Sequence, residues 1–292
     1  MLRNKVYPFY FSLGTLILYS LFFVIPAVMG FGYAFTDWNR YTSAVHYVGT
    51  ENFRTVLSNN DNYIRYARNT ALFSVSTIIL KTVLGLSFAL LLHNGVKHLR
   101  SLYRLLIFLP AVLPMVVVGI MFKSVLDPRR GLLNEMLRDA GLKTWTHLWL
   151  ADPKVALYSI IGVDTWKGAG YIMVILLAGL QTIPDEYYEA AQIDGANAQA
   201  RLRHITIPLL MPALIVSTVL SILHGLKIFD VVYVLTNGGP GYSTEVLYTA
   251  IFKEFSKGRY SIGTAISTLL FLVMVFIGYF VIRLMERGRT NE

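Results

Sequence analysis

Five ionisable side chains interrupt segments that are otherwise apolar: Lys81, Asp164, Lys167, His224 and Lys227. Ionisable groups inside membrane-spanning segments are costly, and they usually face a cavity or a partner. Ammonium and imidazole groups can bind the hydroxyl or anionic groups of a ligand. These residues therefore indicate a path for a polar ligand.

A purely structural interpretation of the same residues stays open. Asp164 and Lys167 are spaced to pair on one helix face, and Lys227 and Asp230 have the same spacing. Lys81 would then snorkel or bind a neighbouring helix.

Motifs of enzyme chemistry are missing from the sequence. It has no Gly-Lys dipeptide, hence no P-loop lysine, no His-x-x-x-His pair and no Gly-x-Ser-x-Gly. With no cysteine there is no thiolate nucleophile and no cysteine-bound metal. A membrane-embedded enzyme would need paired catalytic groups, and the five residues form no recognisable constellation. We expect a non-enzymatic chain without a catalytic or metal site.

The composition indicates a polytopic membrane protein. Of 292 residues, 55% are hydrophobic and 15% charged, against about 45–50% and about 25% in soluble domains. The net charge is +9. The basic residues are scattered rather than in blocks, which favours contact with anionic lipid headgroups over nucleic acid.

Six segments are long and apolar enough to cross a bilayer, which takes about 20 residues each. The sequence predicts an all-α membrane protein, a single transmembrane domain over 1–292. Its helices are expected at about 10–34, 70–92, 105–124, 155–180, 207–229 and 260–283.

The two termini of a six-helix chain share one side of the membrane. The N-terminus (Arg3, Lys5) and the 93–104 loop (Lys97, Arg100, Arg104) are basic without an acidic residue. Since short basic loops favour the cytoplasm, we expect both termini there. The first segment is too long for the apolar part of a cleaved signal peptide.

The segment between the fourth and fifth helices is too organised for a spacer. Pro184, followed by Asp185 and Glu186, is typical of a helix start. Gly195 predicts a break between this helix and a second helical run over 196–204. An amphipathic helix in the lipid headgroups would explain Arg201 and Arg203, but anionic lipid would repel the acidic cluster. We favour a protein partner.

This segment also carries a family resemblance. Glu189-Ala190-Ala191, Gly195, Ile205 and Ile207-Pro208 resemble the cytoplasmic signature of permease subunits of binding-protein-dependent ABC importers, with Ile207 where leucine is usual. Leu235-Thr236-Asn237-Gly238-Gly239-Pro240 is similar to a loop of the carbohydrate class, which includes the larger maltose-importer permease. The resemblance extends over nearly the whole chain.

The resemblance implies a translocation subunit that takes up a carbohydrate (an oligosaccharide, sugar or polyol) through a bacterial or archaeal cytoplasmic membrane. Its partners would be a second permease, a cytoplasmic ATPase dimer and an extracytoplasmic solute-binding protein, besides membrane lipid. ATP and Mg²⁺ would bind the ATPase, with no cofactor in this chain. The loop 184–206 would dock on the ATPase. The residues implied for coupling are Glu189, Ala190, Ala191, Asp194, Gly195 and Ala196.

The resemblance also implies two patches that line the substrate path. They comprise Lys167, Gly168 and Tyr171 on the fourth helix, and His224, Gly225 and Ile228 on the fifth. Lys167 and Lys227 leave an acidic sugar or sugar phosphate open as the substrate.

Several alternatives remain at this point. The 237–241 run could shape the outer rim against the binding protein or only reverse the chain. Trp38, Tyr41 and Tyr47 could be anchors at the lipid headgroups. A self-sufficient secondary transporter or channel would often show two inverted halves, whereas the sequence has one docking loop without a second copy.

Overall fold

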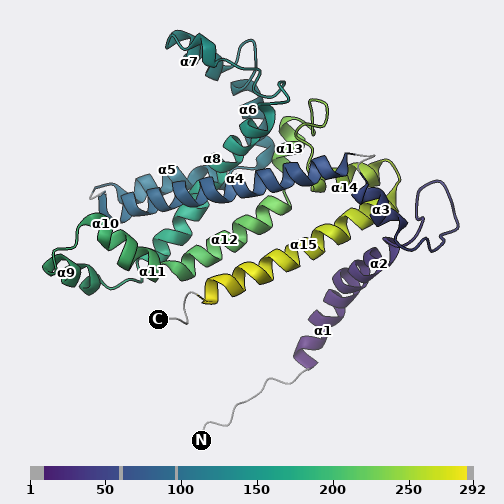
Figure 1. Cartoon of the computed structure of the whole chain (residues 1–292), viewed down its shortest axis with the longest axis horizontal. Helices are drawn as coiled ribbons and strands as arrows, with labels where there is room; N and C mark the ends of the chain where they lie inside the picture. The colour runs from purple at the N-terminus through teal and green to yellow at the C-terminus, as the bar shows by residue number, and fades with distance from the viewer. Residues whose placement is uncertain (1–9, 59–61, 96–97, 288–292) are drawn as a thin grey trace, which may run out of the picture. The chain divides into compact units, whose positions relative to one another are not determined.

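A computed structural model describes residues 10–58, 62–95 and 98–287 of the chain (Figure 1). Within these residues the secondary structure is helical, apart from one isolated β-bridge between Thr36 and Tyr47. The chain forms two compact units. The first comprises residues 1–64 and 250–272, and the second comprises 65–249 and 273–292. Arg3, Lys5 and Lys97, on which the expected orientation partly rests, lie outside the described residues.

The first unit begins with an almost uninterrupted apolar helix. It is built from α1 (Tyr10–Tyr19), a π-helical turn (Ser20–Val24) and α2 (Ile25–Tyr33). Large side chains along it are exposed, among them Phe22 at 73% and Phe23 at 60%. Such a surface would be unfavourable in water but is solvated by lipid.

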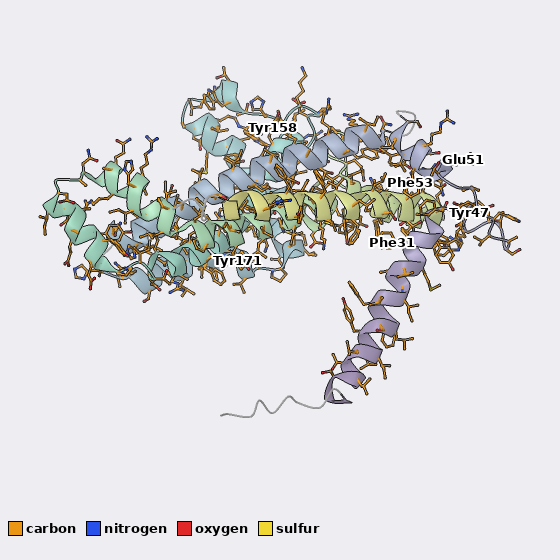
Figure 2. The ribbon with its side chains drawn as sticks, turned by 60° about the horizontal axis from the view of Figure 1, so that its bottom comes forward. Phe31, Tyr47, Glu51, Phe53, Tyr158 and Tyr171 are labelled. Atoms are coloured by element: carbon orange, nitrogen blue, oxygen red, sulfur yellow. The ribbon has the colours of Figure 1, made fainter. Side chains whose placement is uncertain are left out.

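Beyond this helix the first unit has an aromatic and polar end. It includes α3 (Glu51–Leu57), most of α14 (Leu247–Ser256) and the first part of α15 (Tyr260–Arg287). Tyr47 and Phe53 lie at this end (Figure 2), and both rings pack on Phe35. Trp38 stacks on Tyr33, with ring centroids 4.3 Å apart.

Glu254 is the buried acid of this end. It binds Arg259 and, at 3.0 Å, Lys257. Burial raises the pKa of Glu254, but the hydrogen bonds from Arg259 and Lys257 outweigh it, so the pKa lies below its usual value.

The second unit is built around α8 (Ala156–Leu180), which is the most buried of the long helices. Its other elements follow the chain order. They are α4 (Tyr63–Leu90) from Arg65 on, with a π-helical turn (Leu91–Gly95), α5 (Arg100–Val112), α6 (Met115–Val125), α7 (Leu132–Asp139), a 3-10 turn (Lys143–Trp145), α9 (Asp185–Ile193), α10 (Ala198–Arg201), a π-helical turn (Leu202–Thr206), α11 (Ile207–Leu209), α12 (Met211–Leu226), α13 (Asp230–Leu235) and the last part of α15, from Val273 on.

Four helical segments of the described chain are long and apolar enough to span a membrane: Ser12–Tyr33, Tyr63–Gly95, Ala156–Leu180 and Tyr260–Val281. Two further apolar segments are bent, α5 with α6 by 95° and Ala198–Leu209 with α12 by 68°. Counting each bent pair as one span gives six. The chain is thus a multi-pass membrane protein with four to six spans.

The bend between α5 and α6 has a local cause. Leu113 is extended, with ψ of 136°, and Pro114 caps α6. A residue before proline is driven out of the helical region, and proline cannot donate the next helical hydrogen bond. The helix expected at about 105–124 is therefore two shorter helices, α5 and α6.

Two apolar clusters flank the middle of α8. Leu157, Ile160 and Ile161 belong to a cluster with α13 and Val118, whereas Met173, Leu176 and their neighbours pack with α4 and Leu210. Close backbone contacts hold α8 in place, because a Cβ on Gly170 would lie 2.1 Å from the carbonyl oxygen of Ile107 in α5. The polar residues of α8 lie between the two clusters.

Candidate functional site

The loop between α8 and α12 folds as two helices joined by a tight turn. Pro184 precedes α9 in an extended conformation, and Asp185 and Glu186 occupy the first turn, where acids favour the helix dipole. This start was predicted from the sequence. Within the second unit, Figure 1 shows α9 and α7 far apart from each other.

Gly195 forms the turn after α9 with a φ of +75°. The amide of Ala196 donates to the carbonyl of Ala191 at 2.8 Å, and that of Gly195 to Gln192 at 3.1 Å. These hydrogen bonds satisfy carbonyl groups at the end of α9 that would otherwise lack a partner. They require a left-handed backbone conformation at Gly195, which glycine adopts without strain.

The second half of the loop, residues 196–206, which we call the return half, differs in detail from the helix expected over 196–204. Asn197 caps α10 by accepting from the amide of Ala200 at 2.8 Å, so the helix starts at Ala198. It continues through the π-helical turn to Leu209, and α12 begins only at Met211. Pro208 therefore lies before the bend rather than at the start of the long helix, a boundary set by the 68° turn.

Most of the six residues implied for coupling are open to solvent. Glu189, Ala190, Asp194 and Gly195 are exposed, and Ala191 and Ala196 are half-buried. Within the described residues Glu189 forms no ion pair. Ile193, the last residue of α9, is 87% exposed. A free carboxylate beside an exposed apolar side chain suits a protein contact.

A second polar group lies where α4, α8 and α12 meet. The ammonium of Lys81 is 2.5 Å from Oδ2 of Asp164, and Nε2 of His224 is 3.0 Å from Oδ1. The side chains of Lys81 and Asp164 are 6% and 5% exposed, and that of His224 is 49% exposed. Asp164 thus connects three helices through one carboxylate.

The protonation of His224 at Nε2 follows from this geometry. A carboxylate paired with Lys81 can only accept, so the proton of the hydrogen bond is carried by Nε2. The other ring nitrogen remains available for a ligand.

The structure shows which partners these ionisable residues have. Asp164 pairs with Lys81 and His224, not with Lys167. Lys167 instead donates to the carbonyl of Ala111, near the end of α5, at 3.0 Å. Lys81 binds a neighbouring helix, and in the described chain Lys227 forms no ion pair with Asp230. The pairing of Asp164 with Lys81 and His224 could not be seen in the sequence, because these partners lie in other helices, 83 and 60 positions away, rather than one turn away.

Two cavities share this polar group. One, of about 610 Å³, is lined by Lys81, Asp164, Lys167, Gly168, Tyr171 and His224 together with Ala111, Ile172, Leu220 and Ser221. The other, of about 820 Å³, is lined by Asp164, Lys167, His224, Lys227 and Ile228 together with Met115, Leu223, Phe229, Asp230 and Val231. Tyr171, labelled in Figure 2, is exposed.

Five of the six residues implied for the path thus line a cavity, and Gly225 lines neither of the two. A Cβ on Gly225 would lie 2.9 Å from Cα of Ser74, so this glycine permits close packing of α12 on α4. Ser221 and Ala111 are cavity residues that the sequence analysis missed, because nothing in their type or spacing marks them. In the described part of the chain no three His, Asp or Glu residues gather as a metal site would require.

The 237–241 run reverses the chain after α13. Asn237, Gly238 and Gly241 have positive φ. The amide of Asn69 in α4 donates to the carbonyls of Ser243 and Glu245, which fastens the returning segment to α4. The run thus reverses the chain, which is one of the two roles that the sequence left open.

The helical, multi-span architecture with a polar cavity defines a membrane transport protein, and the comparisons with known proteins identify its family. The family model of binding-protein-dependent transport system inner membrane components matches residues 81–291. The chain belongs to this family, and it is therefore a translocation subunit of an ABC importer rather than an enzyme.

Individual proteins similar to this chain are also permeases or components of ABC transporters. The trehalose/maltose transport system permease protein MalF of Thermococcus litoralis is 36% identical, with 91% of this chain and 89% of that protein covered. A crystal structure of a bacterial ABC transporter involved in the import of the acidic polysaccharide alginate matches with a TM-score of 0.83 at 25% identity, covering 96% of this chain and 94% of that one. The bacterial alginate transporter in complex with an alginate pentasaccharide-bound periplasmic protein matches with a TM-score of 0.82 at 26% identity, covering 95% and 93%.

Proposed function

We propose that this permease takes up a carbohydrate through the two cavities around Asp164, and that an ATPase docked on α9 drives this uptake. The observation that carries the proposal is that α8 and α12, which line both cavities, are also the helices on either side of the docking loop. A rigid movement of the loop would reach the cavity without a long relay.

The cavity chemistry supports a sugar. Lys167, Tyr171, Ser221 and the free ring nitrogen of His224 supply donors and acceptors for hydroxyl groups, and the Tyr171 ring can stack on a sugar face. The named substrates of similar permeases are trehalose, maltose and alginate. An acidic sugar remains within the proposal, since Lys167 and Lys227 are free of carboxylate partners in the described chain.

The coupling proposal covers Glu189, Ala190, Ala191, Asp194, Gly195 and Ala196. Glu189 would form a charge-assisted hydrogen bond with a basic group of the ATPase. We further propose six spans in one transmembrane domain, both termini in the cytoplasm, a second permease subunit, an extracytoplasmic solute-binding protein, and ATP with Mg²⁺ held by the ATPase dimer.

The test uses the chain in its native membrane. An Ala190→Cys variant, in a protein that has no other cysteine, is cross-linked and its captured partner identified. Capture of a P-loop ATPase is expected, with Tyr158→Cys as the control, an exposed site on α8 away from the loop. Capture of no ATPase, in a chain that transports alone, would contradict the proposal in favour of a secondary carrier.

The cargo is tested separately. The assembled importer in proteoliposomes is given radiolabelled maltose, trehalose or an alginate oligosaccharide together with its binding protein. ATP-dependent uptake of one of them is expected. The carbohydrate assignment fails if all three are refused while an unrelated solute is taken up.

A further inference from the structure

One hydrogen bond links the two halves of the docking loop. The hydroxyl of Tyr188 in α9 lies 3.1 Å from Oγ1 of Thr206, at the end of the π-helical turn. Thr206 is 4% exposed and donates its own proton to the carbonyl of Arg201 at 3.4 Å. A hydroxyl has one proton, so Tyr188 donates to Thr206. The result is a chain of hydrogen bonds from α9 to the return half.

The ring of Tyr188 ties this bond to the core of the second unit. It is half-buried and packs against the apolar cluster that includes Leu180, Ile183 and Leu210. Leu180 ends α8 and Leu210 precedes α12, so the chain enters and leaves the loop at one cluster. Tyr188 is the residue of α9 that reaches it.

The outer turn of the loop offers no comparable support. A Cβ at Gly195 would meet nothing within 4 Å. A helix of nine residues such as α9 is too short to hold its position by its own hydrogen bonds. Its orientation relative to α12 therefore depends on contacts at its inner side.

We propose that Tyr188 is a positioning residue for energy coupling, holding α9 to the π-helical turn that leads through α11 into α12, through Thr206. This inference rests on the proposed docking of an ATPase on α9. Movement of α9 then reaches the second half of the loop, which continues through α11 into α12, through the Tyr188–Thr206 bond, and it reaches α8 through the chain.

The test is uptake per ATP hydrolysed, measured in one preparation of the complete importer in proteoliposomes with radiolabelled maltose, trehalose and an alginate oligosaccharide as probes. Tyr188→Phe keeps the ring in the cluster and removes only the hydroxyl, and Thr206→Val removes the other one. Each is expected to lower the ratio about fivefold, the order of one hydrogen bond. The double variant should be no worse than either single one, since both break the same bond.

Two variants distinguish positioning from a general loss of structure. Tyr187→Phe is the matched control, because Tyr187 is 54% exposed and its hydroxyl has no hydrogen bond in the described chain. Thr206→Ser keeps the hydroxyl and should retain the wild-type ratio. Thermal unfolding of each variant shows that the fold is retained.

The outcomes separate this inference from the proposed function. An unchanged ratio in both Tyr188→Phe and Thr206→Val, or an equal fall in Tyr187→Phe, would overturn the positioning role while leaving ATP-driven uptake intact. A wild-type importer that neither binds an ATPase nor takes up any probe in an ATP-dependent way would overturn the proposed function, and this inference with it.

Discussion

The loop between α8 and α12 and the polar group that lines the cavities are built in opposite ways. The loop, residues 184–206, is stabilised largely by neighbours in sequence: a proline start, a glycine turn and an asparagine cap. The polar group depends on Lys81, Asp164 and His224, which come from three different helices. The contrast teaches that the loop can change without unfolding the protein, whereas the polar group also holds the helices together.

Breaking the buried ion pair should have the largest effect on stability. Asp164→Asn leaves the ammonium of Lys81 buried without its counter-ion, and such losses cost about 3–5 kcal/mol. We expect a markedly lower unfolding temperature of the purified protein. Asp185→Asn, an exposed acid of the loop, is the matched control and should change little.

The double variant Lys81→Met with Asp164→Asn sharpens this result. With both charges removed, most of the lost stability should return. Single and double variants that unfold at the same temperature as the wild type would show that the pair is not structural.

A substitution that forces α5 and α8 apart should have the second-largest effect on stability. A Cβ at Gly170 would overlap the carbonyl oxygen of Ile107, at 2.1 Å, and backbone cannot move aside as a side chain can. Gly170→Ala is expected to destabilise by about 1–3 kcal/mol. Gly162→Ala on the same helix, where a Cβ meets nothing within 4 Å, is the control. Equal unfolding temperatures for the two variants would argue against this helix contact.

Gly195→Val is expected to disturb the turn after α9 only through the backbone conformation that it disfavours. The φ of +75° disfavours a β-branched residue by about 1–2 kcal/mol, while space is free around the site. We expect a small loss of stability but a severe loss of uptake per ATP hydrolysed. Gly195→Asn, which tolerates positive φ, should restore much of the coupling. Normal coupling in the valine variant would show that the turn geometry is unimportant.

Glu189→Ala should have the smallest effect on stability and still impair transport. Its carboxylate is exposed and forms no ion pair in the described chain, so the unfolding temperature should stay within a degree or so of wild type, as for most surface substitutions. Uptake per ATP hydrolysed is expected to fall about tenfold, as for a lost charge-assisted hydrogen bond. Glu186→Ala, in the first turn of α9, is the control. Wild-type uptake in the Glu189 variant would contradict the docking role.

Much of the loop could be predicted from the sequence. Pro184, the acids after it and Gly195 act within one or two turns of the chain, and their geometry follows from backbone preferences. The cap by Asn197 and the continuation of the helix to Leu209 were missed, because the position of the bend before Met211 depends on packing against the core.

The cavity could be predicted only in part. The ionisable residues were recognisable because charges in apolar segments are rare, and Lys167, Gly168, Tyr171, His224 and Ile228 do line the cavities. Their partners were not predictable, since spacing in the sequence indicates pairs one turn apart, such as Asp164 and Lys167, and not pairs between distant helices. The role of Gly225 could not be predicted either. A glycine that leaves room for a ligand and a glycine that lets a neighbouring helix pack closely cannot be distinguished in the sequence.

The amino-acid sequence alone was enough to predict a helical, apolar, membrane-spanning chain and the two-helix loop between its fourth and fifth spans. These properties depend on composition and on short-range spacing. Three features became visible only in the folded chain: Asp164 joins three helices, two apolar clusters leave a polar region of α8 between them, and Tyr188 reaches Thr206. These depend on which surfaces of distant helices meet, and many similar sequences could satisfy the same local preferences with different packing.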